Sequence, residues 1–559
     1  MEVSSSPAAW SVKSFYNQRL GRWFFCLVAI AFLLSIPLIT IALSVFEPFS
    51  DTWRHLASTV LPSYITHSLL LMLGVAVGTF TLGVSCAWFT CMYAFPGRKV
   101  LEWALLLPMA MPAYIIAYAY TGALDFAGPI QTAIRDTFDV GYGDYWFPEI
   151  RSLGGAVVMF SLVLYPYVYL IVRAAFMSQS HAILEVSRSL GNGPWRTFYA
   201  VALPAARPAI VAGMTLALME TLADYGTVQY FGVSTFTTGI FRTWFGLGDL
   251  TAAAQLSSFL LFFVVLLIVI ERISRKQMQF HHLGQKRAYQ RATLTGSARW
   301  LCFIVCALPL LFGFILPAIQ LCLWVIETWH TSFDAAFFIL VQHSISLAAV
   351  AAILCVLLAV IVCFSARLTS KSRLALFFLR VSTLGYAVPG TVIAVGVLIP
   401  LAALDNGIDN WLRSNTTFVI GLVFSGTLFA VIVAYIVRFL SVSVQSIEAG
   451  FSQIHTSIDD SARTLGRKPL GVLLKVHLPM LKTSLIAAGL LVFVDVMKEL
   501  PTTLILRPFN FNTLAVRAYE LASDERLADA ATPAIAIVLT GLIPVFLLFR
   551  TMRGASKSH

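Results

Sequence analysis

The stretch EVSRSLGNGPWRTFYAVALP, residues 185–204, returns at residues 460–479 as DSARTLGRKPLGVLLKVHLP. The two copies lie 275 positions apart and are identical at seven of their twenty positions. Each copy lies between two apolar runs, the first ending at Arg173 or Arg438 and the second beginning at Pro208 or Thr483. Each copy is therefore expected to connect two membrane spans.

Both copies predict a helix, a turn and a second helix. The first helix ends at a glycine, Gly191 or Gly466, which suits a left-handed C-terminal cap, and a proline follows three residues later. The closing leucine-proline, at Pro204 or Pro479, predicts a break in the second helix before the next span begins.

The composition is that of an integral membrane protein. Of the 559 residues, 58% are hydrophobic and only 12% are charged. A helical span needs about twenty apolar residues, and twelve stretches qualify. They lie at residues 22–46, 64–92, 101–122, 153–177, 208–232, 251–273, 300–325, 341–366, 374–402, 417–440, 481–506 and 530–553. The first stretch is too long for a signal peptide and has no convincing cleavage site, so it is interpreted as a retained anchor.

The net charge of +11 indicates topology rather than nucleic-acid binding. With the N-terminus in the cytoplasm, about 28 of the 38 Lys and Arg residues fall on the cytoplasmic side. The opposite loops at residues 125–149 and 405–409 are acidic. All eight cysteines lie in or beside apolar spans without a CxxC pair, which favours packing over metal or disulfide roles.

The duplication extends beyond the repeated loops. His67-Ser68 opens the second span and His343-Ser344 opens the eighth, while Pro112 in the third span corresponds to Pro389 in the ninth. Six spans in each half give both halves the same orientation. The predicted fold is all-α, with about 12 transmembrane helices in two parallel six-helix repeats. The expected parts are residues 1–273 with a loop at 178–207, a cytoplasmic linker at 274–299, and residues 300–559 with a loop at 441–482.

Four carboxylates occur at matched positions inside the predicted fifth and eleventh spans: Glu220, Asp224, Asp495 and Glu499. A spacing of four residues predicts one helical face within each pair. Carboxylates at this depth usually face a bundle interior or a water-filled path, and they suit a hard cation. The alternative is structural ion pairing, because Lys498 lies beside one pair.

The repeated segment resembles the coupling motif of binding-protein-dependent ABC importer permeases. That motif is Glu-Ala-Ala, three residues, Gly, nine residues and Ile-x-Leu-Pro, and its spacing fits both copies. Here Val186-Ser187 and Ser461-Ala462 replace the alanine pair, and an aspartate leads the second copy. The resemblance implies an ATPase-coupling role for Glu185, Arg188, Gly191, Pro204, Asp460, Arg463, Gly466 and Pro479.

Residues 218–244 and 492–531 further resemble the fused permeases of ferric iron ABC importers, and this likeness covers essentially the whole chain. It implies alternating access in the bacterial inner membrane, with both termini cytoplasmic. The implied partners are a periplasmic ferric-iron-binding protein and a homodimeric cytoplasmic ABC ATPase that uses ATP and Mg²⁺. The chain has no GxxxxGK[ST] loop, so the motor is expected on a separate chain. No cofactor, stable metal site, catalytic residue or nucleic acid is expected for this chain.

Two alternatives remain at this point. Related permeases for thiamine, aminoethylphosphonate or polyamines share the importer class. A proton-coupled secondary transporter can also have twelve spans in two parallel halves, with membrane carboxylates that relay protons. Such a carrier has no need for two matched cytoplasmic helix-turn-helix segments, which argues against it.

Overall fold

The computed structural model describes residues 7–141, 144–178, 187, 189–276, 292–369, 372–416 and 421–557, and these residues are mostly helical. Ten of the described helices are long and apolar enough to cross a membrane. The number rises to twelve if each of two sharply bent helix pairs is taken as one span. The predicted polytopic all-α fold is confirmed.

The chain forms two compact units that do not follow the order of the sequence. Unit 1 contains Met1–Phe46 and Gln342–Phe511, and unit 2 contains Glu47–Val341 and Asn512–His559. The first span thus packs with elements of the second sequence half, and the seventh span packs with elements of the first half. The sequence repeat and the compact units are therefore different divisions of the chain.

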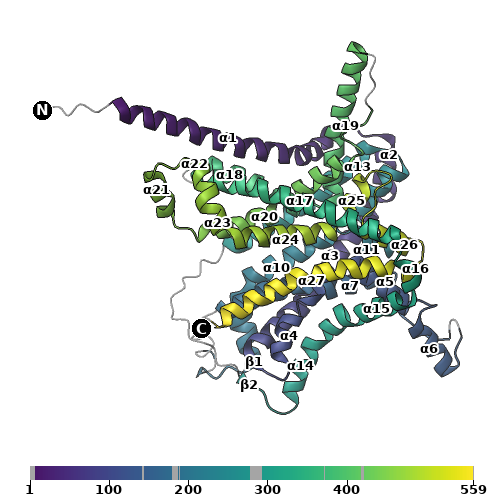
Figure 1. Cartoon of the computed structure of the whole chain (residues 1–559). Coiled ribbons are helices and arrows are strands. Elements are labelled where there is room, and N and C mark those ends of the chain that lie inside the picture. The colour runs from purple at the N-terminus through teal and green to yellow at the C-terminus, as the bar shows by residue number, and fades with distance from the viewer. Residues whose placement is uncertain are drawn as a thin grey trace. The chain divides into compact units, whose positions relative to one another are not determined.

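Unit 1 is built around α20 (Leu428–Ser452), which packs against α24 (Lys482–Met497) and α19 (Gly390–Asn415). The N-terminal helix α1 (Pro7–Leu43) runs along α18 (Arg373–Val381) and α19, where the Trp23 ring meets the edge of Phe364. In Figure 1, α21 and α22 lie beyond the end of α24 that is farther from α25. The remaining elements are η1 (Ser44–Phe46), α17 (Ala335–Leu368), η6 (Leu384–Ala387), α21 (Thr456–Thr464), α22 (Pro469–Val472), η7 (Leu473–His477), α23 (Leu478–Met480) and α25 (Pro501–Leu506).

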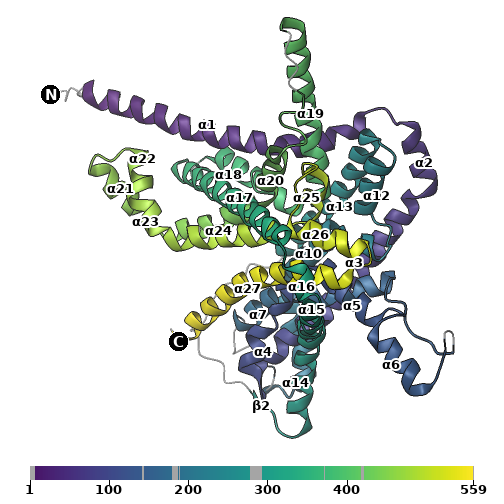
Figure 2. The same ribbon diagram turned by 45° about the vertical axis from the view of Figure 1, so that its right-hand side comes forward.

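Unit 2 is built around α3 (Leu61–Met92), α7 (Leu153–Ser178) and α10 (Leu203–Ala223), which pack against one another. Helix α15 (Leu316–Glu327) packs along α27 (Leu527–Lys557), as Figure 2 shows. The other helices are α2 (Asp51–Thr59), α4 (Arg98–Ala104), η2 (Leu107–Ala110), α5 (Ala113–Leu124), α6 (Pro129–Phe138), α9 (Pro194–Thr197), η3 (Phe198–Ala202), α11 (Gly226–Tyr230), α12 (Phe236–Phe241), η4 (Arg242–Gly246), α13 (Leu250–Lys276), α14 (Ser297–Leu310), η5 (Leu311–Ile315), α16 (Trp329–Ser332) and α26 (Leu514–Ser523). A two-residue parallel pair joins β1 (Tyr93–Ala94) to β2 (Ala292–Thr293).

The third and ninth predicted spans are interrupted at equivalent places. The chain bends by 92° between residues 98–110 and 113–138, and α19 begins only after Pro389. The residue before each proline is extended, with ψ 111° at Met111 and ψ 132° at Val388. A proline disfavours helical geometry in the residue that precedes it. The spans predicted at 101–122 and 374–402 are therefore each interrupted just before a proline.

Candidate functional site

The first copy of the repeat has the predicted turn. Gly191 adopts a left-handed φ of +80°, and the amide of Asn192 donates to the carbonyl of Ser187 over 3.1 Å, as in a helix C-terminal cap. Helix α9 then begins at Pro194. The predicted coupling residues Glu185 and Arg188 lie outside the described residues.

The second copy is described in full and confirms the helix-turn-helix prediction. Helix α21 is closed by Gly466, whose φ is +75°. The amide of Gly466 donates to the carbonyl of Arg463 over 2.9 Å. The amide of Arg467 donates to the carbonyl of Ala462 over 3.1 Å. The Arg463 guanidinium lies 3.3 Å from the Asp460 carboxylate. The glycine of each copy is exposed, so each turn is presented at a surface.

The predicted helix break at the leucine-proline pair occurs in only one copy. In the first copy, residues 194–223 form one continuous helix through Pro204. The π-helical turn η3 accommodates the proline within the helix. In this turn the amide of Leu203 donates to the carbonyl of Phe198, five residues earlier. In the second copy, the helix through Pro479 ends at Met480 and the chain bends by 77° before α24. The break prediction is therefore wrong for Pro204.

Exposed apolar side chains occupy equivalent positions on the two copies. Leu190 is 75% exposed and its repeat equivalent Leu465 is 82% exposed. The further matched and exposed pairs are Trp195 with Leu470 and Tyr199 with Leu474. Clusters of exposed apolar side chains mark interaction surfaces. The sequence analysis did not assign these residues, although the identity of the leucines in the two copies was a usable signal.

In unit 2, Asp224 lies just beyond the end of α10. The helix ends at Ala223 and Asp224 has extended backbone geometry, with ψ 138°. Its carboxylate accepts hydrogen bonds from the Thr227 amide at 2.8 Å and the Thr227 hydroxyl at 3.1 Å. Asp224 therefore caps the start of the short helix α11. Glu220 lies within the last turn of α10 and is half-buried.

In unit 1, Glu499 has the equivalent position beyond the end of α24. Its carboxylate accepts from the Thr502 amide at 3.1 Å and the Thr502 hydroxyl at 2.5 Å, so it caps α25. Arg438 of α20 forms a buried ion pair with Glu499 at 3.4 Å. One turn earlier, Asp495 pairs with Lys498 at 2.9 Å.

These helix ends change the interpretation of the four carboxylates. The spans predicted at 208–232 and 481–506 are broken at residues 224 and 498–500, so neither pair lies on one uninterrupted helical face. Asp224 and Glu499 act as helix caps in both repeats. Structural ion pairing, the alternative for these groups, is present in unit 1.

Arg438 is a buried functional candidate that the sequence analysis treated only as the end of an apolar run. Helix α20 continues past it to Ser452. A methyl group added at Gly390 would lie 2.2 Å from the Arg438 guanidinium and 2.7 Å from the Glu499 carboxylate. A glycine is therefore required where α19 approaches this pair.

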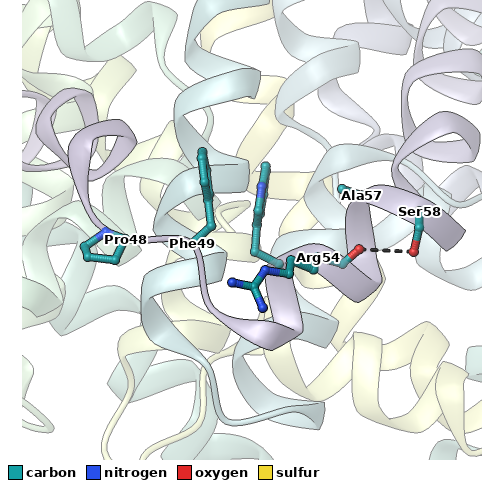
Figure 3. A pocket seen from close by; sticks show the side chains of 6 residues that line it. Pro48, Phe49, Arg54, Ala57 and Ser58 are labelled. Atoms are coloured by element: carbon teal, nitrogen blue, oxygen red, sulfur yellow. Dashed lines mark hydrogen bonds between the residues drawn. The ribbon is translucent and has the colours of Figure 1, made fainter.

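Two further features bear on ligand binding. Among the described residues, no group of three or more His, Cys, Asp or Glu side chains could hold a metal ion. An open hollow of about 760 Å³ lies beside α2 and is lined by Pro48, Phe49, Trp53, Arg54, Ala57 and Ser58 (Figure 3). The Trp53 ring stacks between Phe49 and Phe259. None of the predicted site residues lines this hollow.

Comparison with known proteins identifies what these segments resemble. Residues 79–279 match the family described as the binding-protein-dependent transport system inner membrane component. An Fe(3+)-transport system permease protein of Haemophilus influenzae is 28% identical over 87% of this chain and 89% of its own length. A probable sulfate transport system permease protein of Chlorokybus atmophyticus is 28% identical over 38% of this chain and 71% of its own. A molybdenum transport system permease protein of Escherichia coli is 27% identical over 27% and 62%.

Proposed function

Because residues 79–279 match the family of binding-protein-dependent transport system inner membrane components and an Fe(3+)-transport permease is similar over most of the chain, we propose that the chain is the permease of an ATP-driven importer of ferric iron. In this proposal one copy of the chain supplies both halves of the permease and moves its substrate by alternating access. It lies in a bacterial inner membrane with both termini in the cytoplasm, as the distribution of Lys and Arg favours.

The observation that carries this proposal is the pair of matched exposed segments around Gly191 and Gly466. Each presents a turn closed by a left-handed glycine and three apolar side chains at equivalent positions. Exposed apolar groups at matched places suit two identical docking sites on a symmetric partner. We assign these segments to the two subunits of a homodimeric cytoplasmic ATPase, which binds the ATP and Mg²⁺ that this chain has no phosphate loop to hold.

Ferric iron is the favoured substrate for two reasons. The relative named above that matches most of this chain is named as an Fe(3+) permease. Glu220 and Asp495, the matched pair that does not cap a helix, also suit a hard cation. A periplasmic iron-binding protein would deliver the substrate. Thiamine, aminoethylphosphonate and polyamines are alternative substrates of the same importer class.

The four carboxylates allow a test of the substrate path that separates transport from folding. Glu220→Gln with Asp495→Asn removes one acid from each repeat and leaves both helix caps intact. If these acids attract the cation along its path, we expect the initial rate of iron uptake to fall about tenfold, because each lost charge weakens attraction for the cation in a low-dielectric setting. Uptake would be measured in proteoliposomes that contain equal amounts of folded protein.

The matched control neutralises two exposed acids away from these helices, with Asp51→Asn and Glu327→Gln. It should leave the uptake rate within about twofold of the parent, because exposed charges are screened by solvent. Equal uptake in the Glu220/Asp495 double variant and its parent would assign both acids a purely structural role.

The decisive experiment for the function itself is uptake of radiolabelled ferric iron into proteoliposomes that contain the chain, its ATPase and its binding protein. We expect accumulation only with ATP and binding protein. Uptake driven by a proton gradient without ATP would instead identify a secondary transporter. ATP hydrolysis without iron uptake would exclude iron, and sulfate, molybdate and thiamine would then be tested in the same vesicles.

A further inference from the structure

Three side chains from different elements of unit 1 meet at α21, two of them buried and one partly buried. Asp459 of α21 accepts from Arg367 Nε, at the end of α17, over 2.8 Å. Its other carboxylate oxygen lies 2.6 Å from Nε2 of His477, at the end of η7. Arg367 and His477, which lie 92 and 18 positions from Asp459 in the sequence, thus both contact its carboxylate. We call Arg367, Asp459 and His477 the α21 clamp.

The surroundings of the clamp order it further. His477 is 1% exposed and lies against the rings of Phe364 and Phe451. The remaining guanidinium nitrogens of Arg367 donate to the carbonyls of Phe451 and Ile454, each over 2.8 Å. These carbonyls lie at the C-terminus of α20, where helices leave acceptors without intrahelical partners. The clamp therefore joins α17, α20, α21 and η7.

The geometry also defines the protonation state of the clamp. Burial raises the pKa of Asp459, but the hydrogen bonds from Arg367 and His477 outweigh this and hold its pKa below the usual value. The carboxylate is therefore ionised and accepts a hydrogen bond from His477 Nε2. His477 Nδ1 is buried and finds no hydrogen-bond partner among the described residues.

The first repeat lacks this arrangement. The repeat equivalents of His477 and Arg367 are Ala202 and Cys91, which lie in an apolar cluster of unit 2 with Phe176 and Phe198. The equivalent of Asp459 is Leu184, which lies outside the described residues. Two segments that match on their exposed sides therefore differ in how they are attached to the helices behind them.

We propose that the α21 clamp positions the second coupling segment rigidly on the membrane helices, so that movement of the ATPase subunit at α21 is transmitted to α17 and α20. At the described equivalent positions in the first repeat, Cys91 and Ala202 lie in an apolar cluster instead, which makes the two coupling sites mechanically unequal. This proposal rests on the proposed function. Arg367, Asp459 and His477 are positioning residues, because none of them is exposed on the surface that meets the ATPase.

The test compares variants that break the clamp with one that keeps its hydrogen bond. Asp459→Asn removes the charge that holds Arg367, and His477→Phe keeps the aromatic packing but removes the donor at Nε2. His477→Gln retains a donor near the position of Nε2 and serves as the conservative rescue. The matched control is Glu448→Gln. Glu448 lies on α20 and forms a more exposed ion pair with Arg380 of α18, which this change removes.

The first measurement is hydrogen–deuterium exchange of residues 456–464 in the full chain in lipid nanodiscs, without the ATPase. Losing a charged hydrogen bond should raise exchange of these amides about tenfold or more in Asp459→Asn and His477→Phe. Exchange should stay near the parent value in His477→Gln and Glu448→Gln. Unchanged exchange in both disrupting variants would overturn the clamp, whatever the transported substrate is.

The second measurement is the number of substrate ions imported per ATP hydrolysed in the assembled transporter. We expect this ratio to fall at least about fivefold in the disrupting variants, with the rate of ATP hydrolysis retained. A further variant replaces the clamp with apolar side chains of similar volume, Arg367→Met, Asp459→Leu and His477→Phe, since such replacements often preserve folding. If this triple variant folds and imports as many substrate ions per ATP as its parent, apolar packing alone is enough for coupling and the proposal is rejected.

Discussion

Replacing both Gly191 and Gly466 by leucine is expected to uncouple ATP hydrolysis from substrate uptake. Both glycines have φ near +80°, where a side chain costs about 1 kcal/mol or more per site. A Cβ at either position would meet no atom of the described residues within 4 Å, so no clash with them adds to this cost. The leucine side chains would instead project from the surface that is proposed to meet the ATPase. Uptake should fall about tenfold or more, measured beside ATP turnover in the same proteoliposomes.

Substitutions to asparagine and alanine separate the two causes of this effect, which are backbone strain at positive φ and the bulk of the leucine side chain. Asparagine tolerates left-handed geometry, so Gly191→Asn with Gly466→Asn should retain most of the uptake. Alanine introduces the backbone strain with little bulk and should give an intermediate result. If the double leucine variant takes up substrate at the parental rate, neither segment couples ATP hydrolysis to uptake.

The largest expected effect on folding comes from Glu499→Gln. This change leaves the Arg438 guanidinium buried opposite a neutral amide, and breaking a buried ion pair from one side costs about 3 kcal/mol. The amide oxygen still accepts from the Thr502 backbone, so the cap of α25 is largely preserved. We expect a marked loss of folded protein in detergent, measured by the monodisperse fraction in size-exclusion chromatography and by the thermal midpoint.

Two variants control for this interpretation. Adding Arg438→Met to Glu499→Gln removes the unpaired charge and should restore most of the folded fraction. Asp224→Asn alters the equivalent cap in the first repeat, where Val163 takes the place of Arg438, and should cost only about 1 kcal/mol. A Glu499→Gln variant as stable as its parent would mean that the ion pair makes no net contribution.

The sequence by itself determined the class of the protein and the local structure of the two repeated segments. About twenty apolar residues define each span, and this local property identified a polytopic membrane fold, for which the described residues give ten to twelve candidate spans. The turns at Gly191 and Gly466 were also predictable, because left-handed backbone geometry selects glycine and the following proline starts a new helix. The leucines at positions 190 and 465 could likewise be found from the sequence, because they are identical in the two copies.

Only the tertiary structure decided which elements pack together. The pairing of α1 with α18 and α19, the Arg438–Glu499 ion pair and the α21 clamp join residues that are far apart in the sequence. Hydrophobic periodicity within one span contains no information on the neighbour of that span. At the breaks near residues 224 and 499 the carboxylates accept from residues three positions later, which is a local contact, and only the ion pair of Glu499 with Arg438 depends on the tertiary structure.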